Sequence, residues 1–477
     1  MNETHIDELL ARVPLMKELE EARGATHAPA WLVGGCVRDL LLGRDPVDID
    51  ITTQHAEPLA RRFAGLTGGT LVSMDPERGV WRVAIRGNVH FDFCGFRDHE
   101  IIGDLRGRDF TINAVALRLP ERGTLGGVLD PFNGMQDLQE GTLRMVSHSA
   151  FRDDPCRILR AFRFLADLRL TIEDDTWHAL RVEADRLPLV APERLLTEWW
   201  KLCAGPYAAA SVRQMDEAGA LGVLFPELAD TKGVEQNVYH HLDVWEHLLL
   251  TMTLAARFLQ HPEEAFRDLQ PYFALLLEDE HRRARLVFIA LIHDMGKPGT
   301  RSVKDGKVHF YQHEMLGTEM AAAICRRLRT SREDQAAIRT VIRHHLRPLF
   351  LLQATAKNGP SRRAMGNFFE DAGDYALEIM ALALADKSAS QGAATDPEIV
   401  ENMRRLYRNL FAFHRTNYAP ATAHPLLTGA DLTQHLRLPP GPRVGQILRL
   451  ARKLQIQGQL TSRDEAMAWA AEQVKQE

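Results

Sequence analysis

The sequence has few cysteines and lacks any long hydrophobic run. Its 477 residues include five cysteines, which are scattered and form no CxxC pair, so we expect them to be reduced residues of cores or pockets. No apolar stretch approaches the roughly 20 residues that a membrane helix requires, and we expect no membrane partner. The amino-terminal residues MNETHIDELLARV predict an amphipathic helix rather than a secretory signal. These absences favour a soluble, cytoplasmic protein.

Net positive charge is also missing. The formal net charge is −6 at pH 7, although binding to nucleic acid depends on local phosphate contacts and not on the total. Such contacts must therefore lie in local basic clusters, and arginine-rich stretches such as RRLRTSR and RLARK suit forked contacts with phosphate. With 45% hydrophobic and 26% charged residues, a chain of this length can bury several cores, and we expect three or four domains.

The most informative segment is LVGGCVRDLLLGRDPVDIDITT. Gly34 and Gly35 follow an apolar run, so the backbone can turn sharply and approach an anionic ligand, and Arg38 can face a phosphate. In an extended segment, Asp48 and Asp50 share one face. Two such carboxylates suit Mg²⁺, which prefers one or two carboxylates together with substrate phosphates. The spacing predicts metal-assisted phosphoryl chemistry, and a loop with solvated acids is the alternative.

Two downstream segments add candidate ligands. Asp92, in the alternating run VHFDFCGF, lies on a predicted strand and is either a third acid of the metal site or a polar residue of the outer face. In GRDFTINA, Arg108 is a candidate cation for triphosphate oxygens, while Asp109 and Asn113 either hydrogen-bond a ribose or order the loop. These residues extend the predicted site from a metal to a nucleotide.

A run of residues at spacing three follows Arg152. Asp154, Arg157, Arg160 and Arg163 fall on one slowly drifting face of a predicted helix. Asp154 can accept a hydrogen bond from an exocyclic amine, and Arg157 can donate to a ring nitrogen and a carbonyl oxygen, so the two can read the edge of cytosine or adenine. The alternative is an amphipathic helix held by salt bridges.

In order along the chain, these motifs resemble those of the class II nucleotidyltransferases, the tRNA CCA-adding enzymes and bacterial poly(A) polymerases of the polymerase-β-like superfamily. GRDFTINAVAL resembles the family's RRDFTINA element, DPFNGMQDL its DPxxGxxDL element and FRDDPCRILRAFRF its EDPxRxxRxxRF helix, and PERLLTEWWKL follows as the neck helix would. The resemblance implies that Asp154 and Arg157 select the incoming nucleotide. It places Arg160 and Arg163 nearer the phosphates or the helix scaffold.

Two departures from the family pattern bear on activity. Gly107 stands where the family has the first of two arginines, so that function is shared with Arg106 or lost. Enzymes that add the full CCA end have a long mobile loop before the RRD motif, and the resemblance ties this loop to the switch from cytidine to adenosine addition. Here ten residues separate Arg97 from Arg108, and so short a connector cannot act as such a lever. The chain therefore resembles the CC-adding branch, unless the lever lies elsewhere.

A second cluster of candidate ligands lies in the carboxyl-terminal half. LIHDMGKP places a histidine and an aspartate at the end of an apolar helical run. The order of histidines and acids around it resembles the HD-domain phosphohydrolases, whose metals are held from separate helices, and imidazole with carboxylate suits a transition metal better than Mg²⁺. The resemblance implies a metal held by His247, His293, Asp294, His313, His344 and Asp386. An active phosphodiesterase and a metal-holding relic without turnover both remain open.

The pattern of the whole chain predicts an α+β fold in four parts. Residues 1–145 mix short alternating segments (LVSM, WRVAIRG, VHFDFCGF and AVALRL) with a few helices, and form a nucleotidyltransferase head with a small mixed sheet. Residues 146–235 predict a helical neck and body that recognises the nucleotide, 236–400 an HD-like helical domain, and 401–477 a helical tail. Loops are expected at HPEEA, TRSVKDGKVH and TAKNGPS, and a linker at 418–425.

The tail offers a candidate RNA contact. A Pro/Gly turn at 439–445 opens a predicted helix. Its free amides, with Arg443, Arg449 and Arg452 nearby, suit a tRNA phosphate. A plain capped helix is equally consistent with the pattern.

Three functions are in competition. The first is a CC-adding tRNA nucleotidyltransferase in which Mg²⁺ on Asp48 and Asp50 activates the tRNA 3′-hydroxyl for attack on CTP, leaving the terminal adenosine to a separate enzyme. The second is a complete CCA-adding enzyme or a poly(A) polymerase, which would use ATP as well. The third is an HD-type phosphohydrolase whose head docks RNA. The sequence leaves the oligomeric state open.

Overall fold

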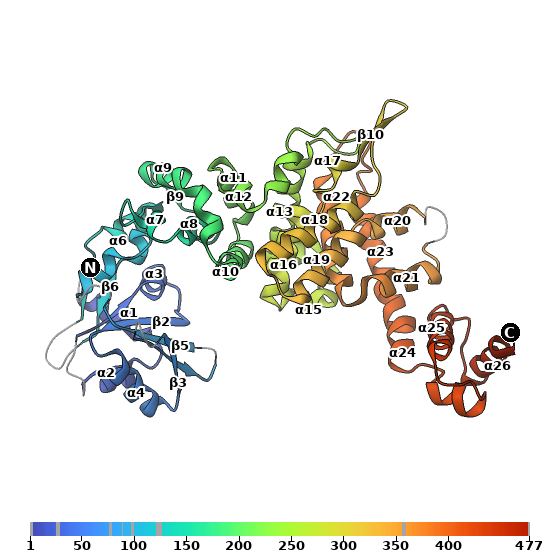
Figure 1. Ribbon diagram of the computed structural model, residues 1–477, viewed down its shortest axis with the longest axis horizontal. Coiled ribbons are helices and arrows are strands. Elements are labelled where there is room, and N and C mark those ends of the chain that lie inside the picture. Colours follow the sequence, from blue (N-terminus) through green and yellow to red (C-terminus); the bar gives the residue numbers. More distant parts are fainter. Residues whose placement is uncertain are drawn as a thin grey trace. The chain divides into compact units, whose positions relative to one another are not determined.

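The computed structural model describes residues 3–24, 29–75, 79–87, 89–96, 100–120, 126–354 and 359–475. Its chain separates into two compact units (Figure 1). The first comprises Met1–Val190 and Glu217–Val223, and the second comprises Ala191–Asp216 and Leu224–Glu477. The predicted α+β fold is confirmed, because a mixed sheet lies in the first unit and the second unit is almost entirely helical. The finer division into four parts stays a prediction.

The sheet of the first unit has seven strands in the order β3-β4-β5-β2-β1-β6-β7. The strands are β1 (Ala30–Val33), β2 (Asp48–Thr53), β3 (Thr70–Asp75), β4 (Val80–Ile85), β5 (Val89–Cys94), β6 (Ala116–Arg118) and β7 (Gly127–Leu129). β2 and β5 pair in parallel, and the other pairs are antiparallel. The four alternating segments predicted as strands lie on β3, β4, β5 and β6.

Helices cover the sheet and continue beyond it. They are α1 (Glu3–Ala11), α2 (Met16–Gly24), α3 (Gly35–Leu41), α4 (Ala56–Thr67), α5 (Ile101–Arg106), α6 (Gly134–Glu140), α7 (Ala150–Asp153), α8 (Cys156–Leu168) and α9 (Asp174–Glu183). A short pair, β8 (Thr142–Leu143) and β9 (Thr171–Ile172), lies among the later helices. Alternation along β5 buries Phe91 and Phe93 against Phe63 of α4, with the rings of Phe63 and Phe91 4.6 Å apart. The apolar face of the sheet is thereby covered by α4, and the polar side chains of β2 and β5 lie on the opposite face.

All the helices after α9 belong to the second unit except α12 (Ala220–Leu224), most of which lies in the first. The remaining helices are α10 (Pro192–Ala204), α11 (Ala208–Glu217), α12 (Ala220–Leu224), α13 (Val244–Gln260), α14 (Pro262–Ala265), α15 (Ala274–Leu277), α16 (Glu280–Ile292), α17 (Lys297–Thr300), α18 (His313–Leu328), α19 (Arg332–His344), α20 (Arg347–Gln353), α21 (Arg362–Ala372), α22 (Ala376–Ala389), α23 (Ile399–Phe413), α24 (Ala419–Ala423), α25 (Pro442–Ile456) and α26 (Arg463–Lys475). Residues 286–292 of α16 and 378–386 of α22 are all buried, as expected for central helices. α13 packs against both of them. Among the described residues, no helix is long and apolar enough to cross a bilayer.

Three segments predicted as irregular have regular structure, so those predictions are wrong. TRSVKDGKVH forms a hairpin of β10 (Arg301–Lys304) and β11 (Lys307–Phe310). Its turn residues Asp305 and Gly306 have φ of 52° and 70°, as the Asp-Gly turn of a tight hairpin requires. HPEEA contains α14, and the predicted linker at 418–425 contains α24. Of TAKNGPS, residues 355–358 lie outside the described residues.

Candidate active site and metal centre

The parallel pairing of β2 and β5 brings three acids together. The register sets Asp50 beside Asp92, with Asp48 two residues earlier on the same face. Burial raises the pKa of Asp50 to about 6, and the charges of Asp92 and Asp48 add to this shift while Arg108 opposes it. Carboxylates crowded in this way favour a cation between them, so the geometry fits a divalent metal.

Gly34 lets two charged side chains close over the backbone. Its φ is +78°, and a Cβ at this position would lie 2.6 Å from Nη1 of Arg108 and 3.0 Å from Oδ2 of Asp50. A Cβ at Gly35 would meet only Nη2 of Arg38, at 3.7 Å, which is an ordinary contact. The structure therefore requires glycine at the first position of the pair and tolerates a side chain at the second.

The third acid, Asp92, is held by Arg82, a residue that the sequence patterns did not reveal. Arg82 on β4 lies opposite Asp92 on β5, and its Nε and Nη2 each donate to a carboxylate oxygen at 2.7 Å. These hydrogen bonds raise the pKa of Arg82 above its ordinary value. Such a forked pair fixes the orientation of Asp92. Only the strand register brings these two residues together, so the sequence carried no signal for the pair.

A buried network joins Asp109, Asn113, Arg38 and Arg160. Asn113 donates to Oδ1 of Asp109 at 3.0 Å, and Arg160 donates to Oδ2 through Nε and Nη2 at 2.9 and 2.7 Å. Burial alone would raise the pKa of Asp109, but Arg160 and the hydrogen bonds outweigh it and bring the pKa to about 2. The geometry thus favours the loop-ordering role for Asp109 and Asn113. Arg38 donates to Oδ1 of Asn113 at 3.0 Å, and its contact with a triphosphate stays a prediction.

The predicted helix is interrupted at Asp154. α7 ends one residue before it, and α8 begins at Cys156. Asp154 itself is extended, with φ −145° and ψ 97°, because the ring of Pro155 disfavours the helical conformation in the preceding residue. The carboxylate of Asp154 accepts a hydrogen bond from the amide of Cys156 at 3.2 Å. The expectation that Asp154 shares a helical face with the arginines is therefore wrong.

The three arginines do lie on α8. Nη2 of Arg157 donates to the carbonyl of Gly107 at 2.6 Å, and Nη1 donates to the carbonyl of Arg108 at 3.2 Å. The helix is thereby tied to the loop that carries the GRDF motif. The guanidinium of Arg163 lies 4.1 Å from the ring centre of Phe164, a cation–π contact. The roles of Asp154, Arg157 and Arg163 toward a nucleotide stay predictions.

In the second unit, side chains from separate helices converge on Asp294. Nε2 of His293 lies 3.2 Å from one of its oxygens and Nε2 of His313 lies 3.1 Å from the other. Nε2 of His247 lies 3.1 Å from Asp386 and 3.6 Å from Asp294. We call this set the cage. The donor atoms of the cage form two groups, and within each group all the atoms lie within 4.8 Å of one another. The first group is His247, His293, Asp294 and Asp386, and the second is Asp294, His313 and His345.

The prediction of His344 as a ligand is wrong, and its neighbour takes the place. His345 is 1% exposed, and its Nε2 lies 3.6 Å from Oδ1 of Asp294. His344 is the last residue of α19 and belongs to neither group of donors. His345 directly follows the last residue of α19, and its ring, not that of His344, faces Asp294.

The cage fits a metal ion. Three of its rings donate Nδ1–H to the carbonyl three residues earlier, at 2.6–2.9 Å, and these are His293, His313 and His345. Their Nε2 atoms are buried and make no hydrogen bond of ordinary geometry in the described part of the chain. Burial lowers the pKa of His247 to about 4, which leaves its ring neutral at pH 7. Ring nitrogens with lone pairs directed at carboxylate oxygens repel them unless a cation lies between.

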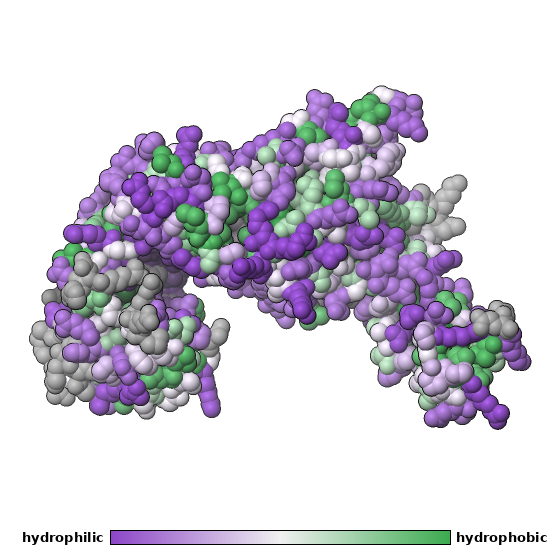
Figure 2. Space-filling model, in the orientation of Figure 1, coloured by the Kyte–Doolittle hydropathy of each residue, from purple (hydrophilic) through white to green (hydrophobic). Residues whose placement is uncertain are grey.

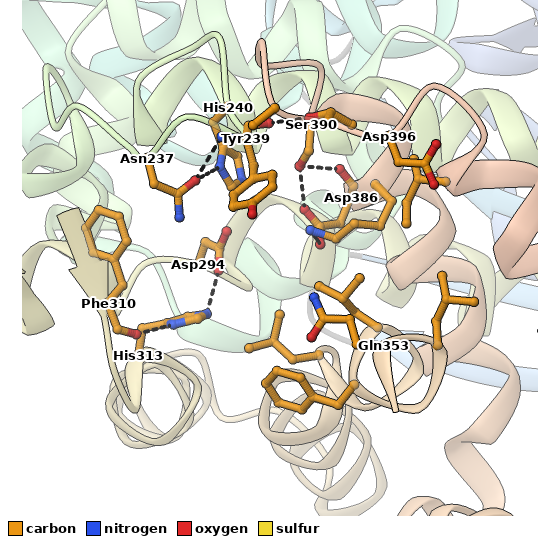
Figure 3. Close-up of a pocket in the computed structure, with 18 of the residues that line it drawn as sticks. Asn237, Tyr239, His240, Asp294, Phe310, His313, Gln353, Asp386, Ser390 and Asp396 are labelled. Carbon is orange, nitrogen blue, oxygen red and sulfur yellow. Dashed lines mark hydrogen bonds and ion pairs between the residues drawn. The ribbon is translucent and has the colours of Figure 1, made fainter. Parts of the chain in front are cut away.

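A cavity of about 830 Å³ opens onto the cage. Figure 3 shows Asp294, His313 and Asp386 reaching it from different elements. Two lysines also line it, Lys297 with Nζ 2.5 Å from Asp294 and Lys387 with Nζ 3.0 Å from Asp386. The sequence analysis missed both lysines, although each follows a predicted ligand within three residues.

His240 was missed as well. It lines the same cavity, and its ring lies 4.9 Å from that of His247. Burial, with Lys297 and His247 nearby, lowers its pKa to about 2. The histidine pair in YHHLD was the available signal.

The tail arginines lie on α25, which begins at Pro442 within the predicted turn. Nη2 of Arg443 donates to the carbonyl of Gln473 at 2.8 Å and ties α25 to α26. Arg449 and Arg452 are exposed. Their contact with RNA stays a prediction.

Three segments match known families. Residues 30–102 and 93–144 match the poly(A) polymerase head domain, residues 169–232 match the probable RNA and SrmB-binding site of polymerase A, and residues 244–390 match the HD domain. The solved structure of the Thermotoga maritima CCA-adding enzyme complexed with tRNA has a TM-score of 0.60 at 22% identity, covering 98% of each chain. At this identity the likeness concerns the fold.

Curated relatives match nearly the whole chain. The A-adding tRNA nucleotidyltransferase of Deinococcus radiodurans is 34% identical over 460 residues, covering 93% of this chain and 96% of the relative. The CC-adding tRNA nucleotidyltransferase of Thermus thermophilus is 31% identical over 452 residues, covering 93% of each. The multifunctional CCA protein of Neisseria meningitidis is 32% identical over 331 residues, 66% of this chain and 72% of the relative. The family resemblance noted in the motifs is confirmed, and the chain belongs to the tRNA nucleotidyltransferases of the CCA-adding type.

Proposed function

We propose that this enzyme adds two cytidines from CTP to the 3′ end of tRNA and leaves the terminal adenosine to a separate A-adding enzyme. The main support for this proposal is the short connector of ten residues between Arg97 and Arg108. Its described part is occupied by α5, whose Leu105 is fully buried and whose Asp104 accepts hydrogen bonds from Arg108 at 3.1 and 3.3 Å. Arg97 lies outside the described residues. A short helix anchored at two points cannot serve as a lever between two pocket shapes.

The proposed mechanism uses the acids of β2 and β5. Mg²⁺ held by Asp48 and Asp50, with Asp92 beside them, would lower the pKa of the tRNA 3′-hydroxyl and offset charge on the phosphates. The 3′ oxygen bonds to the α-phosphorus of CTP while the bond to pyrophosphate breaks. Arg108 lies where it can hold the triphosphate. Asp154 and Arg157 would select the cytosine edge. We expect the reaction to occur in the cytoplasm, in keeping with a role in tRNA processing.

An incorporation assay identifies which nucleotides the enzyme adds. Purified protein is incubated with tRNA that lacks its CCA end, or with tRNA that ends in CC, and with one labelled nucleotide at a time. Two cytidines on the first substrate and no adenosine on the second support the proposal. The 34% identity to an A-adding relative makes adenosine addition to tRNA ending in CC the second candidate. Addition of CCA or of a long adenosine tail would instead indicate a complete CCA-adding enzyme or a poly(A) polymerase.

The cage supports a second activity. We infer that it holds a transition metal and hydrolyses phosphate esters, because buried imidazoles and carboxylates face one another beside two lysines. In such a step water attacks phosphorus, the ester P–O bond breaks, and the leaving oxygen takes a proton. Opening of 2′,3′-cyclic nucleotides to nucleoside monophosphates, or release of phosphate from 3′-phosphorylated nucleotides, supports this activity if it is lost in Asp294→Asn. Metal retention without turnover would indicate a relic.

A further inference from the structure

The β10–β11 hairpin carries basic side chains that the fold does not use. Arg301, Lys304 and Lys307 are exposed, and no ion pair or side-chain hydrogen bond joins them to any described residue. Asp305 in the turn is the sole acid of the segment RSVKDGKVHF. In Figures 1 and 2 the hairpin stands out from the body at the upper right, and its surface is mostly hydrophilic. Such an arm is free to meet phosphates.

The hairpin leads directly into the cavity over the cage. His309, Phe310 and Tyr311, at its end, all line the cavity. The rings of His309 and Tyr311 stack with centres 5.0 Å apart and planes within 9°, and Tyr311 is 65% exposed. Figure 3 shows Phe310 and His313 on the same side of the cavity. Basic side chains followed by an exposed aromatic ring such as that of Tyr311 are a usual means by which proteins hold single-stranded nucleic acid.

The cavity itself suits one nucleotide with a phosphate. Its volume of about 830 Å³ lies within the usual range for ligand pockets. Lys297 and Lys387 supply positive charge beside the cage, and the amides of Asn237 and Gln353 offer hydrogen bonds on its wall. A free nucleotide would contact only the residues that line the cavity, whereas a strand would also reach Arg301, Lys304 and Lys307.

We propose that the cavity and the hairpin together bind the 3′ end of a single-stranded RNA that bears a terminal phosphate. The terminal nucleotide enters the cavity, its neighbour stacks on Tyr311, and the preceding phosphates lie along Arg301, Lys304 and Lys307. The proposal takes its ligand class from the phosphohydrolase activity inferred for the cage. The hairpin is then the element by which the protein distinguishes the ends of RNA from free nucleotides.

Binding by the full-length protein tests the hairpin. A 5′-labelled hexanucleotide RNA with a 3′-phosphate is titrated by fluorescence anisotropy at several salt concentrations. The variant with Arg301→Gln, Lys304→Gln and Lys307→Gln should lose three phosphate contacts, so the slope of log K against log salt should become shallower by about 2, and affinity at 0.1 M salt should fall by about 100-fold. The same RNA with a 3′-hydroxyl should bind the wild type more weakly.

A matched control removes the same charge elsewhere in the second unit. Arg326, Arg332 and Arg339 are exposed on α18 and α19, and their replacement by glutamine should leave the slope unchanged. A 4-thiouridine at the penultimate position, next to the 3′-terminal nucleotide, should cross-link to the peptide that contains Tyr311. Equal losses in the two triple variants, or cross-links confined to the first unit, would overturn the proposal.

Hydrolysis separates this proposal from the activity on which it rests. If the wild type releases no phosphate but the hairpin variant loses RNA affinity, the inferred phosphohydrolase fails and the RNA site stands. If the wild type hydrolyses free nucleotides and the hairpin variant binds RNA like the wild type, the activity stands and the RNA site fails. We expect the hairpin variant to hydrolyse free nucleotides normally and to hydrolyse the 3′ ends of RNA more slowly than the wild type.

Discussion

Replacing Gly34 by alanine is expected to disable nucleotide addition at a moderate cost in stability. Gly34 has φ +78° and ψ −140°, a backbone conformation outside the left-handed helical region, and strain of this kind costs an L-residue roughly 1–3 kcal/mol. The new methyl group would lie 2.6 Å from Nη1 of Arg108 and 3.0 Å from Oδ2 of Asp50, whereas non-bonded heavy atoms settle at about 3.5–4.0 Å. The guanidinium must therefore withdraw by about 1 Å, and a displacement of that size can lower a reaction rate by about 100-fold.

The assay compares two adjacent glycines. Gly35→Ala is the control, because φ is not positive there and the methyl group would meet only Nη2 of Arg38, at 3.7 Å. CTP incorporation into tRNA gives kcat/KM, and urea denaturation gives the free energy of unfolding. We expect about a 100-fold loss in kcat/KM for Gly34→Ala and a change within a few-fold for Gly35→Ala. Near-normal turnover by Gly34→Ala, or equal losses in both variants, would show that the close contacts at Gly34 do not position Arg108 for nucleotide addition.

Three further predictions concern charge and metal. Arg160→Gln should destabilise the protein by about 3 kcal/mol because it leaves the buried carboxylate of Asp109 unpaired, and Asp109→Asn in the same chain should restore part of that loss in urea denaturation; no recovery would contradict the network. The pKa of Asp109, about 2 against an ordinary 3.8, implies roughly 2 kcal/mol of stability that is present above about pH 4 and lost as pH falls toward 2. Unfolding free energies of wild type and Asp109→Asn should therefore converge on acidification, and parallel curves would count against it. His345→Ala should lower the metal content measured by elemental analysis while His344→Ala should not, and the reverse order would restore His344 as the ligand.

Sequence patterns predicted the head well where alternation decides the geometry. The fully buried isoleucines beside Asp48 and Asp50 follow from the period of a strand. The pairing of Asp50 with Asp92, and of Asp92 with Arg82, depends on which strands are neighbours and in what register. Single-sequence patterns do not carry that information, so Asp92 was left ambiguous and Arg82 was missed.

Other errors had local causes that the sequence did contain. Pro155 should have placed Asp154 outside the helix, and the Asp-Gly pair at 305–306 should have indicated a hairpin. The choice between His344 and His345 is different, because it depends on where α19 ends against the cage. The order of ligands identified the HD domain, but only the packed helices show which ring of the pair faces Asp294.

Nucleotide addition is proposed to depend on the metal held by the carboxylates of β2. This dependence is tested most directly by measuring CTP incorporation and tRNA binding for Asp48→Ala and Asp50→Ala, with the wild type alongside. Both variants should bind tRNA with near wild-type affinity and add no cytidine. Extension of tRNA by either variant at a rate close to that of the wild type would contradict this dependence.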